Sequence, residues 1–226
     1  TSCYYLAGTA TGGFDGADTS GQTTAIEKNL FEHSPTFEGW DFETVWDMDV
    51  ILGRPVLRAL AEDSYRRITV STLAELEAFR DSVNAGEKSY DLYVTLAADI
   101  DLGGSEQNQW TPIGTKDISF GGIFDGAGHK ITGLHINRPN DDYQGLFAHN
   151  AGTIQNLCVD GSVTGGAYVG GIVGNNNTFG WLQNCCNHCT VKGGMIVGGI
   201  AGGHADTQFG ISDHCKILRC YNTGSV

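Results

Sequence analysis

The stretch GAYVGGIVGNNNTFGWLQNCCNHCTV, residues 166–191, carries two patterns that point in different directions. Its first part is an apolar beat framed by glycines, in which Ile172 and Gly174 alternate with Val173. Such alternation is typical of a strand, whose successive side chains lie on opposite faces. Its second part is a group of cysteines around one histidine, Cys185-Cys186-Asn187-His188-Cys189. The first part indicates a scaffold and the second resembles a metal site.

Two short patterns recur along the chain, an apolar one and a glycine-framed one. An apolar beat repeats in four stretches: ITGLHI from Ile131, IQNLCV from Ile154, LQNCCN from Leu182 and ILRCYN from Ile217. A glycine-framed beat alternates with it, around Ile123, Leu146, Ile172 and Ile200. A repeat of this size cannot bury its own apolar face, so stacking of repeats has to form the core. The sequence therefore predicts a solenoid.

The predicted fold is all-β, a right-handed parallel β-helix, because parallel crossovers strongly favour that hand. Equivalent residues of successive coils should form inward-facing columns. One predicted column contains Leu157, Cys185 and Cys220, and another contains Val163, Val191 and Val226. Glycine makes up 33 of 226 residues, and 22 of these follow residue 120, as the tight corners of such coils require.

Two domains are predicted, residues 1–66 and residues 67–226. The second opens with a capping helix over 72–85, in which Thr72 and Glu75 form a capping box before an apolar stripe. This helix would cover the exposed edge of the first coil. The first domain is predicted to combine the end of a preceding repeat array with an aromatic β-hairpin. It also contains a short helix signalled by a second capping pattern, Thr24 with Glu27.

Charge and hydropathy exclude several classes of function. The 13 basic and 26 acidic residues give a net charge of −13, which repels phosphate backbones and makes nucleic acid an improbable partner. No run of 18 apolar residues is present, so no membrane insertion of this stretch is expected. Because the chain begins Thr1-Ser2 without Met, we expect a cut or processed piece of a longer array.

The strings GGIVGN and GGIAGG resemble the GLUG-motif repeats of bacterial surface proteins. WTPIG, FGGIFDGAGHKITGL and NAGTIQNLCVDGSV are similar to the way such arrays begin, and GWDFETVW with GRPVLRAL is similar to a segment that often follows one. The resemblance covers most of the chain. It implies an extracellular location on a bacterial cell, in an adhesin-like protein or in the accessory region of an immunoglobulin A1-specific metallopeptidase. The zinc motif of those peptidases, His-Glu-x-x-His, does not occur in this sequence.

The cysteine group admits a zinc interpretation and a structural one. Zinc could be held by Cys186 and Cys189 in a C-x-x-C spacing, completed by His188 or by His214 and Cys215. However, Cys185 and Cys186 are adjacent on a strand and point to opposite faces, so they cannot chelate one ion together. Buried, stacked cysteines are the favoured interpretation. We therefore predict no metal, no cofactor and no catalytic residue.

Carboxylates are the second set of candidates, because β-helix enzymes that cut polysaccharides gather acidic groups on one outer face. Asp99 and Asp101 share a strand face, and Asp125 precedes His129 in FDGAGH. The structural alternative is that Asp99 and Asp101 flank the buried Ile100 and that Asp-Gly is turn chemistry. Acidic turns could also hold calcium, but no EF-hand loop or Gly-Gly-x-Gly-x-Asp repeat is present.

Aromatic residues at one growing corner are the third set. The distance from the glycine beat to the next apolar beat is 8, 8, 10 and then 17 residues, so insertions collect at one place. Exposed rings there would contact a glycan or a surface protein of host or bacterium. We predict ligand contact at this corner, by Phe179, Trp181, His204 and Phe209. The structural alternative is that these rings cap the widening corner and exclude water.

Three functions follow from these patterns. The favoured one is a non-catalytic extracellular module of a large surface protein, which acts as an adhesive domain or a stalk and stacks on further repeats of the same chain. The second is the accessory region of an immunoglobulin A1-specific zinc metallopeptidase whose catalytic domain lies elsewhere. The third is a carbohydrate-active β-helix enzyme. A His-Glu-x-x-His motif in the complete gene would favour the second, and carboxylates converging in one groove would favour the third.

Overall fold

The computed structural model describes residues 65–177, 179–204 and 215–226 in full, and the backbone of four strands before them. The chain divides into two compact units, Thr1–Tyr65 and Arg66–Val226. In the first, β1 (Cys3–Leu6) pairs in parallel with β2 (Thr23–Ile26), and β3 (Trp46–Asp49) pairs antiparallel with β4 (Arg54–Leu57). The β3–β4 pair occupies the stretch for which a hairpin was predicted.

A helix beginning near Thr24 is wrong, because Thr23–Ile26 is the strand β2. The sequence of this strand is TTAI, and three of its four residues are β-branched, which favours strand over helix. The capping pattern therefore does not start a helix at Thr24, and the residues from Glu27 to Val45 lie outside the described residues.

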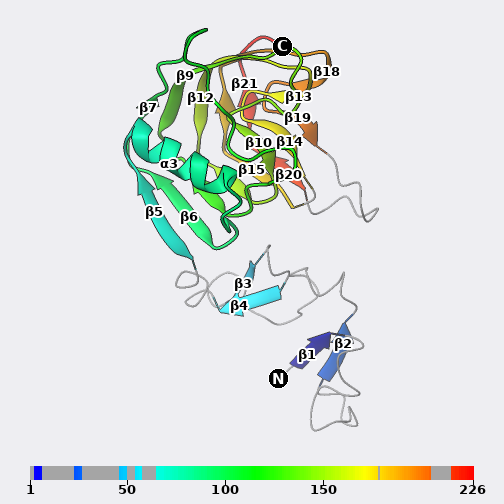
Figure 1. Ribbon diagram of the computed structural model, residues 1–226. Coiled ribbons are helices and arrows are strands. Elements are labelled where there is room, and N and C mark those ends of the chain that lie inside the picture. The colour runs from blue at the N-terminus through cyan, green and yellow to red at the C-terminus, as the bar shows by residue number, and fades with distance from the viewer. Residues whose placement is uncertain are drawn as a thin grey trace. The chain divides into compact units, whose positions relative to one another are not determined.

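The second unit is a parallel β-solenoid of about five turns. One face is a six-stranded sheet, here called the β11 sheet (Figure 1). Its strands in chain order are β5 (Arg66–Val70), β6 (Leu92–Leu96), β8 (Ile123–Asp125), β11 (Thr153–Gln155), β15 (Trp181–Gln183) and β20 (Lys216–Leu218). Neighbouring strands all pair in parallel, as the repeat predicts.

A second face, here called the β12 sheet, follows the first around each coil. It contains β7 (Ile100–Asp101), β9 (Lys130–Asn137), β12 (Cys158–Thr164), β16 (Cys186–Asn187) and β21 (Tyr221–Asn222), with β17 (Thr190–Lys192) also on β12. Two smaller sheets complete the coils. They are β10 (Phe147–Asn150), β14 (Val173–Asn176) and β19 (Ala201–His204), and β13 (Ala167–Gly170) with β18 (Met195–Gly198).

The register corrects the alignment of the first repeat. Ile131 pairs with Val159, whereas the partner of Ile154 is Phe124, from the glycine-framed string GGIFDG. That string therefore belongs to the β11 sheet. The position beside Phe147 that was expected for the string is occupied by Ile113, which pairs with Phe147 in parallel. The reason is that glycines precede strands on more than one face of the coil, so a glycine beat alone does not identify the face.

Gly152 shows why small residues recur at these corners. A Cβ atom there would collide with the carbonyl oxygen of Gly122, one coil away. Close approach of two backbones at such a corner admits no side chain.

The predicted helix is confirmed as α3 (Leu73–Asn84), and its capping box is complete. The Thr72 side chain accepts a hydrogen bond from the Glu75 amide, and Glu75 accepts one from the Thr72 amide. The helix buries Leu76, Phe79 and Val83 against the solenoid. Phe79 packs on Phe120 and Phe124 with ring centroids 5.7 and 5.9 Å apart, so α3 joins the inner core.

The predicted columns form, with one exception. Leu157 and Cys185 are fully buried and Cys220 continues their column half-buried. Val163 and Val191 pair in register and are buried, but Val226 is 66% exposed. Exposure at the last coil follows because no described coil stacks beyond it.

The aromatic core generates a stability prediction. Phe124 is fully buried and lies 5.3 Å from Phe147, ring to ring. Replacing Phe124 by alanine should lower the free energy of unfolding by about 3–5 kcal/mol, because it leaves a cavity between coils. Urea denaturation of Phe124→Ala measures this. Tyr90→Ala, at a ring that is 44% exposed, is the control and should change stability by less than about 1 kcal/mol. Equal effects would contradict the packing described.

Candidate functional site

The β12 sheet presents two ladders of side chains on its outward face. The first consists of Lys130, Cys158, Cys186 and Tyr221, which are register partners on β9, β12, β16 and β21. The second lies two residues further along each strand and contains Asp160, His188 and Thr223. Because strand side chains alternate, both ladders point away from the core.

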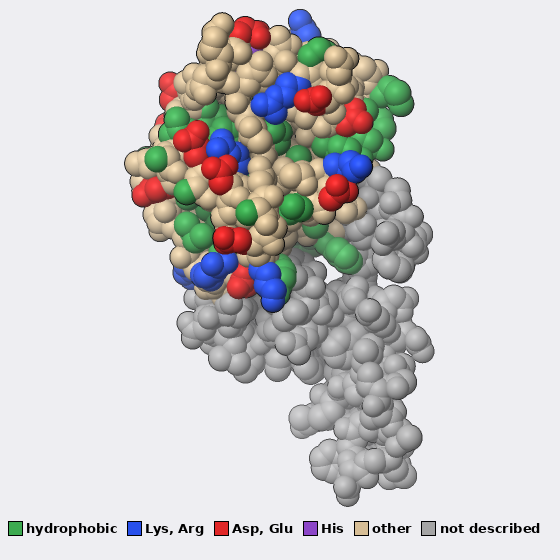
Figure 2. Space-filling view, viewed as in Figure 1, with side chains coloured by type: hydrophobic (Ala, Val, Ile, Leu, Met, Phe, Trp, Pro, Cys, Tyr) green, Lys and Arg blue, Asp and Glu red, His purple; other side chains and the backbone are tan. Residues whose placement is uncertain are grey.

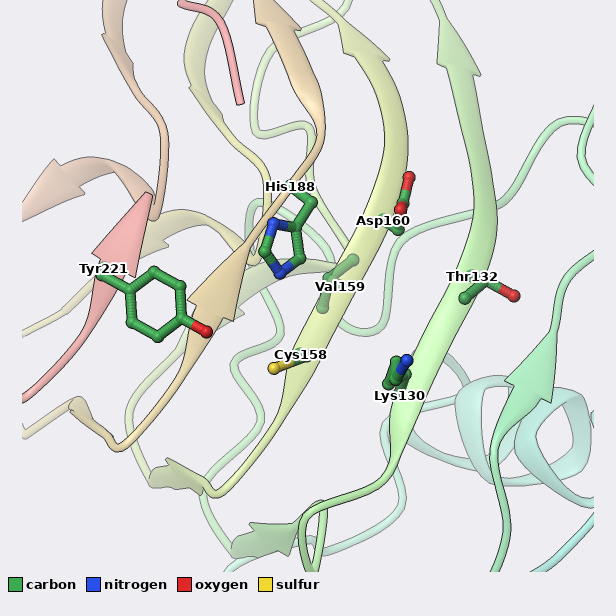
Figure 3. Close-up of a pocket in the computed structure, with 7 residues that line it drawn as sticks. All are labelled: Lys130, Thr132, Cys158, Val159, Asp160, His188 and Tyr221. Carbon is green, nitrogen blue, oxygen red and sulfur yellow. The ribbon is translucent and has the colours of Figure 1, made fainter. Parts of the chain in front are cut away.

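These ladders line a hollow of about 490 Å³. Figure 3 shows its side chains projecting from neighbouring strands: Lys130, Thr132, Cys158, Val159, Asp160, His188 and Tyr221. The rings of His188 and Tyr221 lie edge to face with centroids 6.1 Å apart, and Tyr221 is 56% exposed. The Nδ1 atom of His188 hydrogen-bonds the Thr223 hydroxyl. The hollow thus offers one ammonium, one carboxylate and two oriented rings to a ligand.

A disulfide joins Cys158 to Cys186 in the wall of this hollow. The two residues are direct register partners in adjacent coils, with Cα atoms 4.5 Å apart, inside the range that disulfides span. Sequence reasoning missed this pair because it combined Cys186 with residues of its own string and of the following long loop, and not with Cys158 of the preceding coil. The signal was available: Cys158 and Cys186 are 28 residues apart, the same separation as the register partners Val163 and Val191.

The metal candidates divide between the two faces of the strand. As predicted, Cys185 points inward, where its thiol donates to the Gln183 carbonyl, and Cys186 points outward into the disulfide. Cys189 is buried in the core and does not join Cys186 as a C-x-x-C pair. Burial raises the pKa of Cys189 to about 12.

The ligand atoms of Cys158, Cys186 and His188 lie within 4.8 Å of one another. They would suit a soft cation only with both thiols free, because thiolate is the ligand form of cysteine. The disulfide uses both sulfurs, so the trio serves as a cross-link beside an imidazole. His214, an alternative zinc ligand of the sequence prediction, lies outside the described residues, as does Phe209, which was predicted to contact a glycan or protein ligand.

The described corner residues come from two sheets. Trp181 lies on β15 of the β11 sheet, with the Lys216 ammonium 5.0 Å from its ring centroid. Phe179, 39% exposed, precedes it in the turn. His204 ends β19 of a different sheet and hydrogen-bonds Asn176 at 3.3 Å and Cys215 at 3.1 Å. Burial lowers its pKa. Ligand contact by Phe179, Trp181 and His204 stays a prediction, and the His204 ring is held by these two hydrogen bonds.

The carboxylates are also dispersed. The side chain of Asp125, on β8, accepts hydrogen bonds from Tyr93, Gln155, Asn156 and the Ala127 amide at 2.8–3.0 Å. Asp101, on β7 of the β12 sheet, accepts from the Gly103 amide. Asp99 contacts His129 at 3.1 Å and flanks the buried Ile100, as the structural interpretation predicts. Each is occupied by local turn or strand contacts rather than directed into one groove.

Comparisons with known proteins find two partial similarities. The chain is 37% identical to Halomucin from Haloquadratum walsbyi over 120 residues, which cover 48% of this chain and 1% of Halomucin. It is 35% identical to a putative Gly-rich membrane protein from Evansella cellulosilytica over 114 residues, which cover 47% of this chain and 13% of that protein. The chain thus matches only a small part of either relative.

No protein-family model and no solved structure matches the chain. The names of the two relatives mention neither GLUG repeats nor immunoglobulin A1-specific metallopeptidases, so that resemblance stays a prediction. Among the described residues, no helix has the length and hydropathy needed to cross a membrane.

The cross-link generates a second prediction. Replacing Cys158 and Cys186 together by alanine opens a 28-residue loop and should lower the free energy of unfolding by about 3–4 kcal/mol, the chain-entropy value for that length. Urea denaturation without reductant measures the change. Cys189→Ala removes a buried thiol outside the disulfide and separates packing loss from cross-link loss. A double variant as stable as the wild type would show that the disulfide does not constrain the coils.

A third prediction concerns pH. Burial raises the pKa of Asp125, but hydrogen bonds from Asn156, Ala127, Gln155 and Tyr93 outweigh it and hold the pKa below its ordinary value. A carboxyl with a depressed folded-state pKa contributes stability above its unfolded pKa, about 3.9, and loses it as the pH falls through the folded value. Urea midpoints should therefore fall below about pH 4.

The Asp125→Asn variant should be less stable at neutral pH and should show a shallower loss of stability in acid. Asp117→Asn, at an exposed carboxylate, is the matched control and should keep the slope of the wild type. The assignment fails if Asp125→Asn and the wild type lose stability in parallel between pH 7 and pH 3.

Proposed function

We propose that this chain is a non-catalytic extracellular repeat module of a large surface protein, where it acts as a stalk and as an adhesive domain. The observation that carries the proposal is that side chains of successive coils bond to one another along the stack. Cys158 bonds Cys186, and the Asn184 amide donates to Asn156 at 3.0 Å. Side chains that join each coil to the next suit a module whose task is to hold its shape.

The similarities support a surface location. One relative is named Halomucin and the other a putative Gly-rich membrane protein, and both are far longer than the part matched here. The net charge of −13 disfavours nucleic acid and other polyanions as partners. Figure 2 shows acidic and basic side chains interspersed on the visible face of the second unit, without a basic patch for an acidic polymer.

Adhesive contact is proposed at the corner that contains Trp181. Its ring is half-buried and carries the Lys216 ammonium, and Phe179 stands exposed two residues earlier. A fixed aromatic ring beside a cation suits the apolar face and the hydroxyls of a sugar, and it suits a protein partner equally. Dispersal of Asp99, Asp101 and Asp125 counts against the alternative of a glycoside-cleaving enzyme, which needs two convergent carboxyls.

Retention on immobilised glycans of host and bacterial origin tests the proposal, with newly released sugar ends read in the same wells. The full 226-residue chain should be retained without release. Trp181→Ala should weaken retention at least about tenfold, or ~1.4 kcal/mol. Tyr90→Ala, at an exposed ring on another part of the unit, is the matched control and should leave retention unchanged.

Release of sugar ends that persists after repurification would overturn the non-catalytic assignment. Retention that Trp181→Ala leaves intact would overturn the corner as the adhesive surface. A chain that is neither retained nor releases ends would leave the stalk as its role.

A further inference from the structure

Two thiols stand at equivalent places in the last two coils, on the inner face of the β12 sheet. Cys185 and Cys220 each immediately precede a residue of a register pair, Cys186 and Tyr221. The Cys185 amide donates a hydrogen bond to the Cys220 sulfur at 3.4 Å. Cys185 is fully buried and Cys220 is half-buried. They are therefore consecutive members of one inward column.

The two thiols are also in contact with each other. A hydrogen bond from the Cys185 thiol lowers the pKa of Cys220 to about 7. The same contact, together with burial, raises the pKa of Cys185. Since thiolate is the nucleophile in disulfide exchange, Cys220 is the thiol that reacts first. Its partial exposure also makes it the one that an oxidant can reach.

The disulfide already present shows that the coil spacing permits such a bond. Cys158 and Cys186 are likewise equivalent residues of adjacent coils, with Cα atoms 4.5 Å apart. Cys185 and Cys220 repeat this relation one residue earlier and one coil further, on the opposite face of the sheet. Neighbouring parallel strands keep the same separation along a stack, so closure of the second pair requires no shift of a coil.

We propose that Cys185 and Cys220 form a second disulfide between coils in the oxidised protein. The Cys220 thiolate attacks one sulfur of a small disulfide such as oxidised glutathione and releases one glutathione thiolate. The Cys185 sulfur then attacks the mixed disulfide at Cys220, the Cys185 proton leaves with the second glutathione, and the protein disulfide closes. Two electrons pass from the cysteine pair to the oxidant, which becomes two glutathione molecules.

The consequence is a covalent tie across three successive coils. The outer disulfide joins the coil of β12 to that of β16, and the inner one joins the coil of β16 to that of β21. Because Cys185 and Cys186 point to opposite faces, the two bonds do not exchange while the coils stay folded. The tie secures the coil in which Ile217, Leu218 and Tyr221 are exposed.

Peptide mapping of the full chain tests the inference directly. The chain is incubated with oxidised glutathione, its remaining thiols are alkylated, and trypsin is applied without reductant. Cleavage after Arg219 releases Cys220 alone in peptide 220–226, whereas Cys158, Cys185, Cys186 and Cys189 fall in peptide 131–192. The wild type should yield these two peptides linked, with loss of alkylation at Cys220. Cys185→Ser should yield peptide 220–226 unlinked, and Cys189→Ser, the matched control, should keep the link.

Peptide 220–226 recovered unlinked from the oxidised wild type, with the Cys158–Cys186 disulfide intact, would overturn the inference. A link that survives Cys185→Ser and is lost in Cys189→Ser would overturn it as well, by assigning Cys220 another partner. An unlinked peptide 220–226 from the wild type overturns the inference without any variant, and a linked one is assigned to Cys185 by the two serine variants. Glycan retention does not enter this test, so the inference and the proposed function stand or fall separately.

Discussion

Backbone groups of each coil point along the stack, toward the coil before and the coil after. The His188 amide donates to the Val159 carbonyl at 2.8 Å, and one coil further the Thr223 amide donates to the Asn187 carbonyl at 3.0 Å. Unpaired N–H and C=O groups in a buried strand cost free energy comparable to a lost hydrogen bond, so each coil requires a neighbour in register. Once the register is set, every side chain stands beside its equivalent one coil away. The columns of the core and both outward ladders follow from this constraint.

Asparagine side chains of successive coils also pair because the coils are in register. The Asn150 side chain donates to that of Asn176 at 2.8 Å, and Asn187 donates to Asn222 at 2.8 Å. An amide has both a donor and an acceptor, so a column of asparagines satisfies itself inside the corner of a solenoid. A coil that slipped by one residue would separate these amides and turn its apolar side chains to solvent. The register is therefore fixed both by apolar burial and by polar pairing.

Much of the fold is predictable from the sequence, because apolar and glycine residues recur with the period of the coil. The solenoid, α3 and the column of Leu157 and Cys185 all follow from that recurrence. The assignment of Ile123 and Ile131 to a face does not follow from that recurrence, because the glycines that precede a strand look alike on every side of the coil. The Cys158–Cys186 bond was within reach of the sequence, because its separation equals that of Val163 and Val191.

The site is less predictable than the fold. Exposed rings were expected at one corner, and Trp181 and His204 come from two different sheets; the hollow, which the sequence did not indicate, crosses β9, β12, β16 and β21. Sequence spacing identifies where insertions fall, but not which way a coil presents its strands to solvent. Asp125 resembled a catalytic carboxyl for the same reason. Three of its four hydrogen-bond donors, Tyr93, Gln155 and Asn156, are 30–32 positions away and become neighbours only by stacking.

Scalar couplings across hydrogen bonds, measured by NMR, test the central claim most directly. In a parallel stack with this register, the His188 amide nitrogen should couple to the Val159 carbonyl carbon, and the Thr223 amide nitrogen to that of Asn187. Detection of both couplings would establish two consecutive coil-to-coil contacts on one face in the free protein. Couplings from these amides to carbonyls of other residues would contradict the register, and with it the columns, the ladders and both cysteine pairs.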